Sequence, residues 1–280
     1  MWLLFALLSG LFYTGSNLIT RHVLKKDKND AWAFSFFFSA VGALVSLPFM
    51  LFQPKIGTQP QAWLILILIG FLIVSQNLLN FISSRYLVPS VSGSITKFRL
   101  VWVMLLSIII LHESSNSFKI IGTVLTLLSG LIIMKKLLKP KDIRGVLSAF
   151  GATIFYSTVI ILYKFLFASF NSATLTFFIF FIPAIINLLL MPNSIRRVRA
   201  LAQSQFKPVF LACALGGFAN LAMNHSLSIG EASKVLVIIE SFLVVTLIGE
   251  HFLLKEKENI VGKVIAVILA TLGAILIRLS

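Results

Sequence analysis

The feature that most constrains this chain is a series of long apolar runs, each about as long as a bilayer crossing. A helix needs about 20 predominantly apolar residues to span the hydrocarbon core. Backbone N–H and C=O groups find no water partners there, so continuous runs of this length favour helices. We therefore predict an all-α membrane protein with ten transmembrane helices, at residues 2–21, 31–52, 62–83, 89–111, 118–135, 145–166, 172–191, 208–228, 232–254 and 260–279.

Composition excludes several other classes. The 280 residues are 58% hydrophobic and 12% charged, with a mean hydropathy of +1.00, whereas soluble domains are about half apolar and a quarter charged. The net charge of +15 does not indicate nucleic acid, because the cations lie mainly in short segments between apolar runs, as in membrane loops. Cys213 is the only cysteine, which excludes an intramolecular disulfide. The first run lacks the basic start and cleavage site of a signal peptide, so we expect it to remain as the first helix.

An internal repeat divides the chain into two halves. At a shift of 143 residues, identical polar residues coincide without a gap: Tyr13 with Tyr156, Asn77 with Asn220, and Glu113 with Glu256. The halves, 1–137 and 144–280, would hold five helices each. An odd number of crossings makes the second half enter the membrane from the opposite side, so we predict two inverted five-helix repeats, an arrangement typical of secondary transporters.

The basic residues predict the orientation. The segments after the first, third, fifth, seventh and ninth predicted helices contain 17 of the 24 Lys and Arg residues, against five on the other side. The positive-inside rule then places the 17 in the cytoplasm and both chain ends outside, in a multi-pass protein of the cell membrane.

Three ionisable residues lie in the middle of predicted spans, where a charge costs about 2.5–3.5 kcal/mol on insertion scales. Lys97 and Arg99 lie in the fourth predicted helix, and Glu240, in the ninth, is the repeat counterpart of Lys97. We expect these charges to meet near the midplane. The two cations are about 200° apart around a helix, so at most one pairs directly with Glu240, and the sequence leaves open which one. The charges either line a solute path or dock the two halves.

Amides and tyrosines form stripes one helical turn apart. They either line a water-filled cavity or join helices by hydrogen bonds. These candidate solute-binding residues are Tyr13, Asn17, Gln76, Asn77, Asn80, Tyr156, Asn220 and Asn224.

The last predicted helix of each half, together with the glutamate that precedes it, resembles a known family. Glu113 precedes "FKIIGTVLTLLSGLIIM", and Glu256 precedes "GKVIAVILATLGAILI". Together with ten helices in two repeats, this resembles the EamA family of the drug/metabolite transporter superfamily. The resemblance implies an exporter or permease for amino acids, other metabolites or toxic compounds, with a central cavity lined by the first, third, fourth, sixth, eighth and ninth helices. The chain departs from the family pattern in lacking proline in the fourth helix of each half and in having Ala266 where glycine is expected. The resemblance also implies cytoplasmic chain ends, whereas the charge distribution predicts the opposite.

These observations predict a secondary-active transporter that moves a small polar or amphipathic metabolite, such as an amino acid, by alternating access. Glu240 is the candidate for proton coupling. No nucleophile elbow, phosphate loop or metal-ligand motif is present in the sequence, so we predict no enzyme activity, cofactor or metal. Two alternatives remain: a non-transporting membrane partner or assembly protein, and a lipid-handling flippase.

Overall fold

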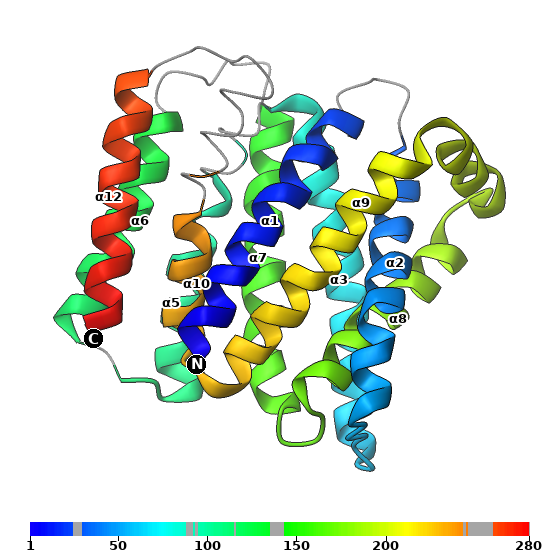
Figure 1. Cartoon of the computed structure of the whole chain (residues 1–280), viewed down its shortest axis with the longest axis horizontal. Coiled ribbons are helices and arrows are strands. Elements are labelled where there is room, and N and C mark those ends of the chain that lie inside the picture. Colours follow the sequence, from blue (N-terminus) through cyan, green and yellow to red (C-terminus); the bar gives the residue numbers. More distant parts are fainter. Residues whose placement is uncertain are drawn as a thin grey trace.

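The computed structural model describes residues 1–24, 30–87, 92, 95–114, 116–134, 143–242, 245 and 260–279. Every named element in these ranges is a helix, and successive long helices run in alternating directions (Figure 1). The helices are α1 (Trp2–Leu24), α2 (Ala31–Phe52), α3 (Pro60–Tyr86), α5 (Arg99–Leu111), α6 (Ser117–Met134), α7 (Ile143–Leu166), α8 (Ser172–Leu190), α9 (Ser194–Ile229), α10 (Ala232–Ser241) and α12 (Ile260–Leu279).

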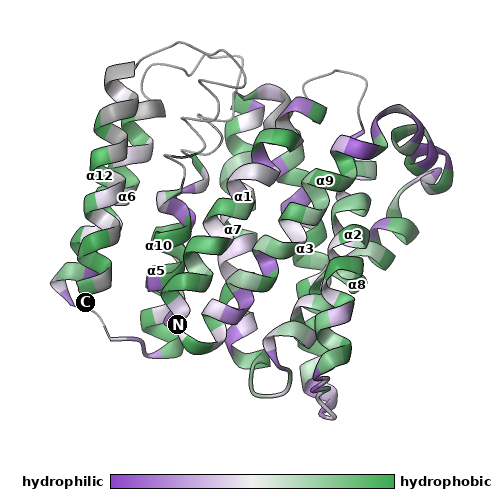
Figure 2. Ribbon diagram, viewed as in Figure 1, coloured by the Kyte–Doolittle hydropathy of each residue, from purple (hydrophilic) through white to green (hydrophobic). Residues whose placement is uncertain are grey.

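Length and hydropathy identify the helices that suit a bilayer. In the described part of the chain, α1, α2, α3, α7, α8 and α9 are each long and apolar enough to cross a membrane, and α5 and α6 are shorter apolar helices. Hydrophobic residues cover most of the ribbon, with polar residues gathered at the helix ends and at the first turns of α9 (Figure 2). The prediction of an all-α protein is therefore confirmed for the described residues.

Local sequence signals fix several helix ends. The Asp30 carboxylate accepts hydrogen bonds from the N–H groups of Trp32 (2.9 Å) and Ala33 (3.3 Å) and caps α2. The Asn171 side chain caps α8 through the N–H of Thr174 at 2.8 Å. These caps satisfy backbone donors that the first helical turn leaves without a partner.

Two predicted helices differ from those observed. The predicted span 89–111 is interrupted, because Lys97 and Phe98 form a turn in which the Leu100 N–H bonds the Lys97 carbonyl (2.9 Å), a tighter step than an α-helix makes. The predicted span 232–254 ends as α10 at Ser241, and most of its remainder lies outside the described residues. At the 143-residue shift of the repeat, the turn at Lys97–Phe98 corresponds to Glu240 and Ser241, the last two residues of α10.

The eighth span also begins earlier than predicted. The basic stretch after α8 is helical from Ser194, and α9 bends at Gln205, whose φ of −151° and ψ of 40° are not helical. Pro208 lies three residues beyond the bend, and a proline inside a helix disrupts the backbone bonding of the preceding turn.

The packing of the helices places two pairs at opposite ends of the molecule and the other helices between them. α6 and α12 lie at one end of the molecule, α2 and α8 at the other, and α1, α3, α5, α7, α9 and α10 lie between them (Figure 1). At the α6–α12 contact, a Cβ built on Gly122 would lie 2.7 Å from the Gly273 carbonyl oxygen, so only glycine permits this approach. Both chain ends lie on one face, called here the terminal face (Figure 1).

Candidate functional site

An ion pair joins the two interrupted helices in the interior. Arg99, the first residue of α5, donates through Nη2 to the Glu240 carboxylate near the end of α10. Glu240 is 7% exposed, and the Arg99 side chain 22%. The structure thus identifies Arg99 as the direct partner of Glu240, the choice that the sequence left open.

Aromatic and amide side chains surround this pair. The Arg99 guanidinium lies over the Tyr156 ring of α7, 4.3 Å from its centroid, in a cation–π contact. The Tyr156 hydroxyl donates to Met223 Sδ of α9 at 3.2 Å. From α1, Tyr13 lies within electrostatic range of Arg99 and Tyr156 and beside the Asn220 side chain of α9. We call Arg99, Glu240, Tyr156, Tyr13 and Asn220 the central cluster.

Arg99 has hydrogen-bonding capacity to spare. A guanidinium carries five N–H donors, and within the described part of the chain one of them is used, toward Glu240. Its Nε is buried and reaches no acceptor among the described residues. A buried donor without an acceptor is costly, so the central cluster favours a ligand that brings an acceptor oxygen.

Lys97 points elsewhere. Its side chain is 1% exposed and its Nζ donates to Ser129 Oγ (2.6 Å) and to the Thr126 carbonyl (3.3 Å), both on α6. In the described chain these partners are neutral. Lys97 therefore bonds to α6, whereas Arg99 pairs with Glu240. The turn at Lys97–Phe98 separates the two cations, so that one side chain lies toward α6 and the other toward α10.

Of the remaining predicted site residues, some are buried in the interior, and the rest are half-buried or exposed. Asn77 on α3 is 8% exposed, one turn beyond the core residue Ile73. Asn224 is fully buried and donates to Thr176 Oγ1 of α8 at 2.9 Å, so it joins two helices. Gln76 and Asn80 are half-buried on α3, and Asn17 is exposed on α1. The central cluster therefore contains Tyr13, Arg99, Tyr156, Asn220 and Glu240 of the predicted set.

A second group of charges lies at the terminal face, where the sequence indicated only helix-end charges. Lys119, at the start of α6, is 1% exposed and donates to Glu231 (2.8 Å) and Glu113 (3.3 Å). Lys234 pairs with Glu231 at 3.4 Å. We call Glu113, Lys119, Glu231 and Lys234 the terminal-face network. Glu256, the repeat counterpart of Glu113, lies outside the described residues.

Glu113 also caps a helix. Its carboxylate accepts hydrogen bonds from the Ala232 N–H (2.8 Å) and from Ser233 Oγ (2.6 Å), so it caps α10 from a distant part of the chain. Burial raises the pKa of the Glu113 carboxyl, but these hydrogen bonds and Lys119 outweigh burial and lower it on balance. Glu113 is therefore held as a carboxylate. The sequence contained one signal for this site, a glutamate directly after an apolar helix.

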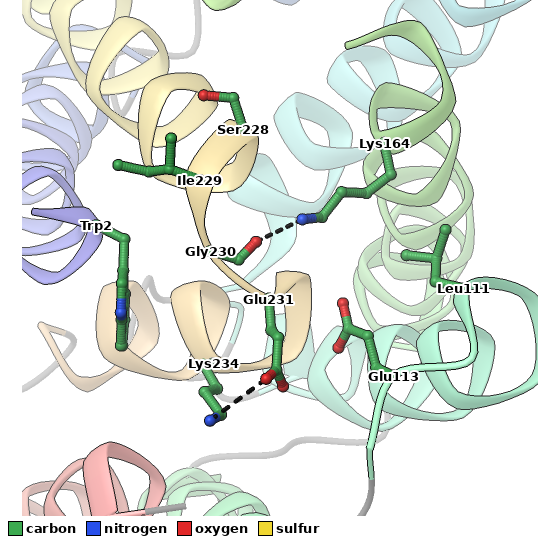
Figure 3. A pocket seen from close by; sticks show the side chains of 9 residues that line it. All are labelled: Trp2, Leu111, Glu113, Lys164, Ser228, Ile229, Gly230, Glu231 and Lys234. Carbon is green, nitrogen blue, oxygen red and sulfur yellow. Dashed lines mark hydrogen bonds and ion pairs between the residues drawn. The ribbon is translucent and has the colours of Figure 1, made fainter. Parts of the chain in front are cut away.

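A cavity of about 550 Å³ opens beside the terminal-face network (Figure 3). Its wall combines apolar side chains with charges contributed by the ends of several helices. The lining residues are Trp2, Leu111, Glu113, Lys164, Ser228, Ile229, Gly230, Glu231 and Lys234. Lys164, in the last turn of α7, donates to the carbonyls of Leu227 (2.8 Å) and Gly230.

The fold and its internal charges define an integral membrane protein, and the comparisons with known proteins give its family. The profile of the EamA-like transporter family matches residues 1–135 and 143–279. The chain belongs to this family and is a membrane transporter of the drug/metabolite transporter type.

One solved structure, titled only "Crystal structure of protein", has a similar fold. It superposes with a TM-score of 0.75 over 99% of this chain and 96% of that one, at 15% sequence identity. At this identity the similarity extends to the fold alone. The comparison with curated proteins found no match.

Proposed function

We propose that the chain is built from two inverted five-helix repeats, residues 1–137 and 144–280. The helix contacts support this, because most of them keep their pattern when each helix is exchanged for its counterpart. α1 packs on α9 and α3 on α7; α5 packs on α7 and α1 on α10. α2–α8, α5–α10 and α6–α12 are contacts between counterparts. A pseudo-two-fold axis relating the halves would produce these pairings.

Within this arrangement, the protein is a secondary-active transporter of a small polar or amphipathic metabolite, such as an amino acid, working by alternating access. The observation that carries the proposal is the Arg99–Glu240 pair, which joins α5 and α10 where both fourth helices of the repeats are interrupted. Interrupted helices at a repeat interface are a common location for solute sites in secondary transporters. The free Arg99 donors suit a carboxylate, and the Tyr13 and Tyr156 rings suit an apolar group.

The driving force is an ion gradient, with Glu240 as the proton-coupling carboxylate. When the halves rock, the Arg99–Glu240 pair separates, and a separated buried carboxylate favours protonation. The solute occupies Arg99 while Glu240 carries the proton. Asn77, Gln76 and Asn80 on α3 would line the path, together with Asn17 on α1.

Orientation in the cell membrane follows from charge. Lys55, Lys119, Lys164 and Lys234 lie at the terminal face, whereas Arg144, Arg196, Arg197 and Arg199 lie at the opposite face. Because most Lys and Arg residues of the sequence belong to the opposite face, the positive-inside rule makes the terminal face extracellular or periplasmic. A reporter fused to the C-terminus checks this, because activity of a strictly cytoplasmic reporter would reverse the orientation.

Flux of radiolabelled amino acids into proteoliposomes, with and without a pH gradient, tests the transport mechanism. Glu240→Gln should abolish the dependence on the pH gradient, and Arg99→Met should abolish flux while the protein stays folded. Lys55→Gln, at the terminal face and away from the central cluster, is the matched control. Gradient dependence that survives in Glu240→Gln would reject the coupling role.

A docking role for the same pair gives a different result. If the Arg99–Glu240 pair only holds the halves together, Arg99→Met lowers thermal stability, and the double variant Arg99→Met, Glu240→Leu restores it. Replacing a buried ion pair by apolar residues is often neutral or stabilising, whereas removing one partner is costly. Restored stability without restored flux supports transport.

A further inference from the structure

The cavity at the terminal face lies in line with the central cluster. Four of its walls come from α1, α5, α7 and α10 or the residues beside them, the helices that also carry Tyr13, Arg99, Tyr156 and Glu240. At 1.5 Å per residue, Leu111 is about 18 Å along α5 from Arg99, and Glu231 is about 14 Å along α10 from Glu240. A solute that travels between the central cluster and the terminal face therefore meets this cavity on its way.

A layer of closely packed side chains separates the two places. Val103 of α5, Ile160 of α7 and Leu236 of α10 are all 0% exposed and belong to one core, and Tyr163 beside them is 3% exposed. Each of these residues lies between the central cluster and the cavity along its own helix. The cavity is thus a second compartment, which a solute can occupy without touching Arg99.

The charges around the cavity do not balance. Glu113 and Glu231 supply two carboxylates, whereas Lys119, Lys164 and Lys234 supply three ammonium groups. Lys119 is fully occupied, because it donates to both carboxylates and to the Ser114 carbonyl at 2.8 Å. Lys164 donates to two neutral carbonyls. The ammonium of Lys234 shares Glu231 with Lys119 and stays at 3.4 Å from it. Among the described residues, the cavity wall and the neighbouring Lys119 together therefore carry one positive charge in surplus.

We propose that this cavity is a second solute site, which binds the carboxylate of a small amphipathic organic acid. Lys234 and Lys164 would supply the cations for the carboxylate, and Trp2, Leu111 and Ile229 would supply the apolar surface. Figure 3 shows these side chains in the wall of the cavity. A volume of about 550 Å³ falls in the range of small-molecule sites. The inference rests on the proposed transport of a small amphipathic metabolite, and it narrows the solute to one that carries a carboxylate.

Calorimetric titration of the purified full chain in detergent tests this site without any need for flux. Three probes share one apolar body and differ in charge: 3-phenylpropionate, 3-phenylpropan-1-ol and 3-phenylpropylamine. We expect the carboxylate to bind most tightly. Lys234→Gln should weaken its binding about fivefold, and Glu231→Gln, which removes a competing carboxylate, should strengthen it by a similar factor.

Two further variants locate the binding. Lys55→Gln, a lysine at the same face outside the cavity, should leave the affinity unchanged. In Arg99→Gln, which removes the carboxylate site proposed for the central cluster, the binding that depends on Lys234 should persist. Loss of carboxylate binding in Arg99→Gln with no change in Lys234→Gln would overturn the proposal. Equal binding of the alcohol or the amine, or no binding of any probe, would overturn it as well. If the protein proves not to transport, the cavity still binds the carboxylate, so the two proposals fail separately.

Discussion

Two ion-pair sites, the Arg99–Glu240 pair in the interior and the Lys119 site at the terminal face, differ in the number of partners that each cation has. In the described chain, Arg99 makes one hydrogen bond through its guanidinium, to Glu240, and keeps a buried Nε without an acceptor. Lys119 donates to two carboxylates and a carbonyl. A cation whose donors are all used holds structure together, whereas a cation with unused donors is available to a ligand. Stability and transport should therefore respond in opposite ways to mutation of the two sites.

The largest expected effect on stability is at the terminal-face network. Lys119→Met leaves two buried or half-buried carboxylates without their shared cation, and removing one partner of a buried pair costs about 3 kcal/mol. The loss in the free energy of unfolding should be at the low end of the usual range, because Glu113 keeps its hydrogen bonds from Ala232 and Ser233. Thermal unfolding in detergent measures the change. Lys55→Met, an exposed lysine at the same face, should change stability by less than about 0.5 kcal/mol.

Mutation of the Arg99–Glu240 pair should affect flux more than stability. Arg99→Lys keeps the charge but loses the planar fork that binds Glu240 and a carboxylate together. We expect flux to fall by about tenfold to a hundredfold, equivalent to 1.4–2.8 kcal/mol, with thermal stability nearly unchanged. If Arg99→Lys unfolds as readily as Lys119→Met, the Arg99–Glu240 pair is structural. The proposed difference between the two sites would then be absent.

The sequence predicted the helices better than it predicted the partners of the buried charges. The six long apolar helices of the described chain follow from hydropathy and length, and the shift of 143 residues brought position 97 into line with Glu240. It could not choose between Lys97 and Arg99, because the tight turn at Lys97–Phe98 changes the direction of each side chain. Such a rotation depends on the packing of neighbouring helices and leaves no trace in hydropathy.

The terminal-face network was missed for a related reason. Lys119 counts in the sequence as one of five cations on the less basic side, and nothing there indicates that it is buried. Its burial follows from the meeting of α6 with the residues that precede α10, 112 residues away in the chain. The bend of α9, by contrast, had a local signal in Pro208.

A third buried cation, Lys97, sharpens the comparison, because it lies only two residues before Arg99 in the chain. Its buried ammonium has neutral partners among the described residues, and burying such a charge is costly. Lys97→Met should therefore leave stability unchanged or raise it by about 1 kcal/mol. Ser129 stays satisfied, because its hydroxyl also donates to the Thr126 carbonyl at 2.6 Å. Flux should stay within about threefold of the wild type, whereas Arg99→Met abolishes it. A loss of flux as complete in Lys97→Met would mean that Lys97 contacts the solute.

At the face opposite the chain ends, Asp30 joins α2 to the first segment of α9. Burial raises the pKa of the Asp30 carboxyl, but Arg197, which donates through Nε and through Nη2 (2.6 Å), and the two cap bonds lower it on balance. Asp30→Asn keeps an oxygen for the cap and should cost about 0.5 kcal/mol, since half-exposed ion pairs contribute little. Asp30→Ala also loses the cap and should cost about 1.5 kcal/mol. Equal losses in the two variants would exclude a contribution from the cap.

The smallest effect is a pH dependence of stability that comes from Glu113. Its folded-state pKa lies below the ordinary value of about 4.3, so the unfolded chain takes up the proton first as the pH falls. The stabilisation is complete above the ordinary pKa and is lost as the pH falls through the lower, folded-state pKa. Unfolding midpoints of the wild type and Glu113→Gln, measured from pH 6 downwards, should therefore begin to converge once the pH falls below the ordinary pKa of about 4.3. If the gap stays constant over this range, the Glu113 charge contributes nothing, and the hydrogen bonds to α10 alone hold the terminal-face network together.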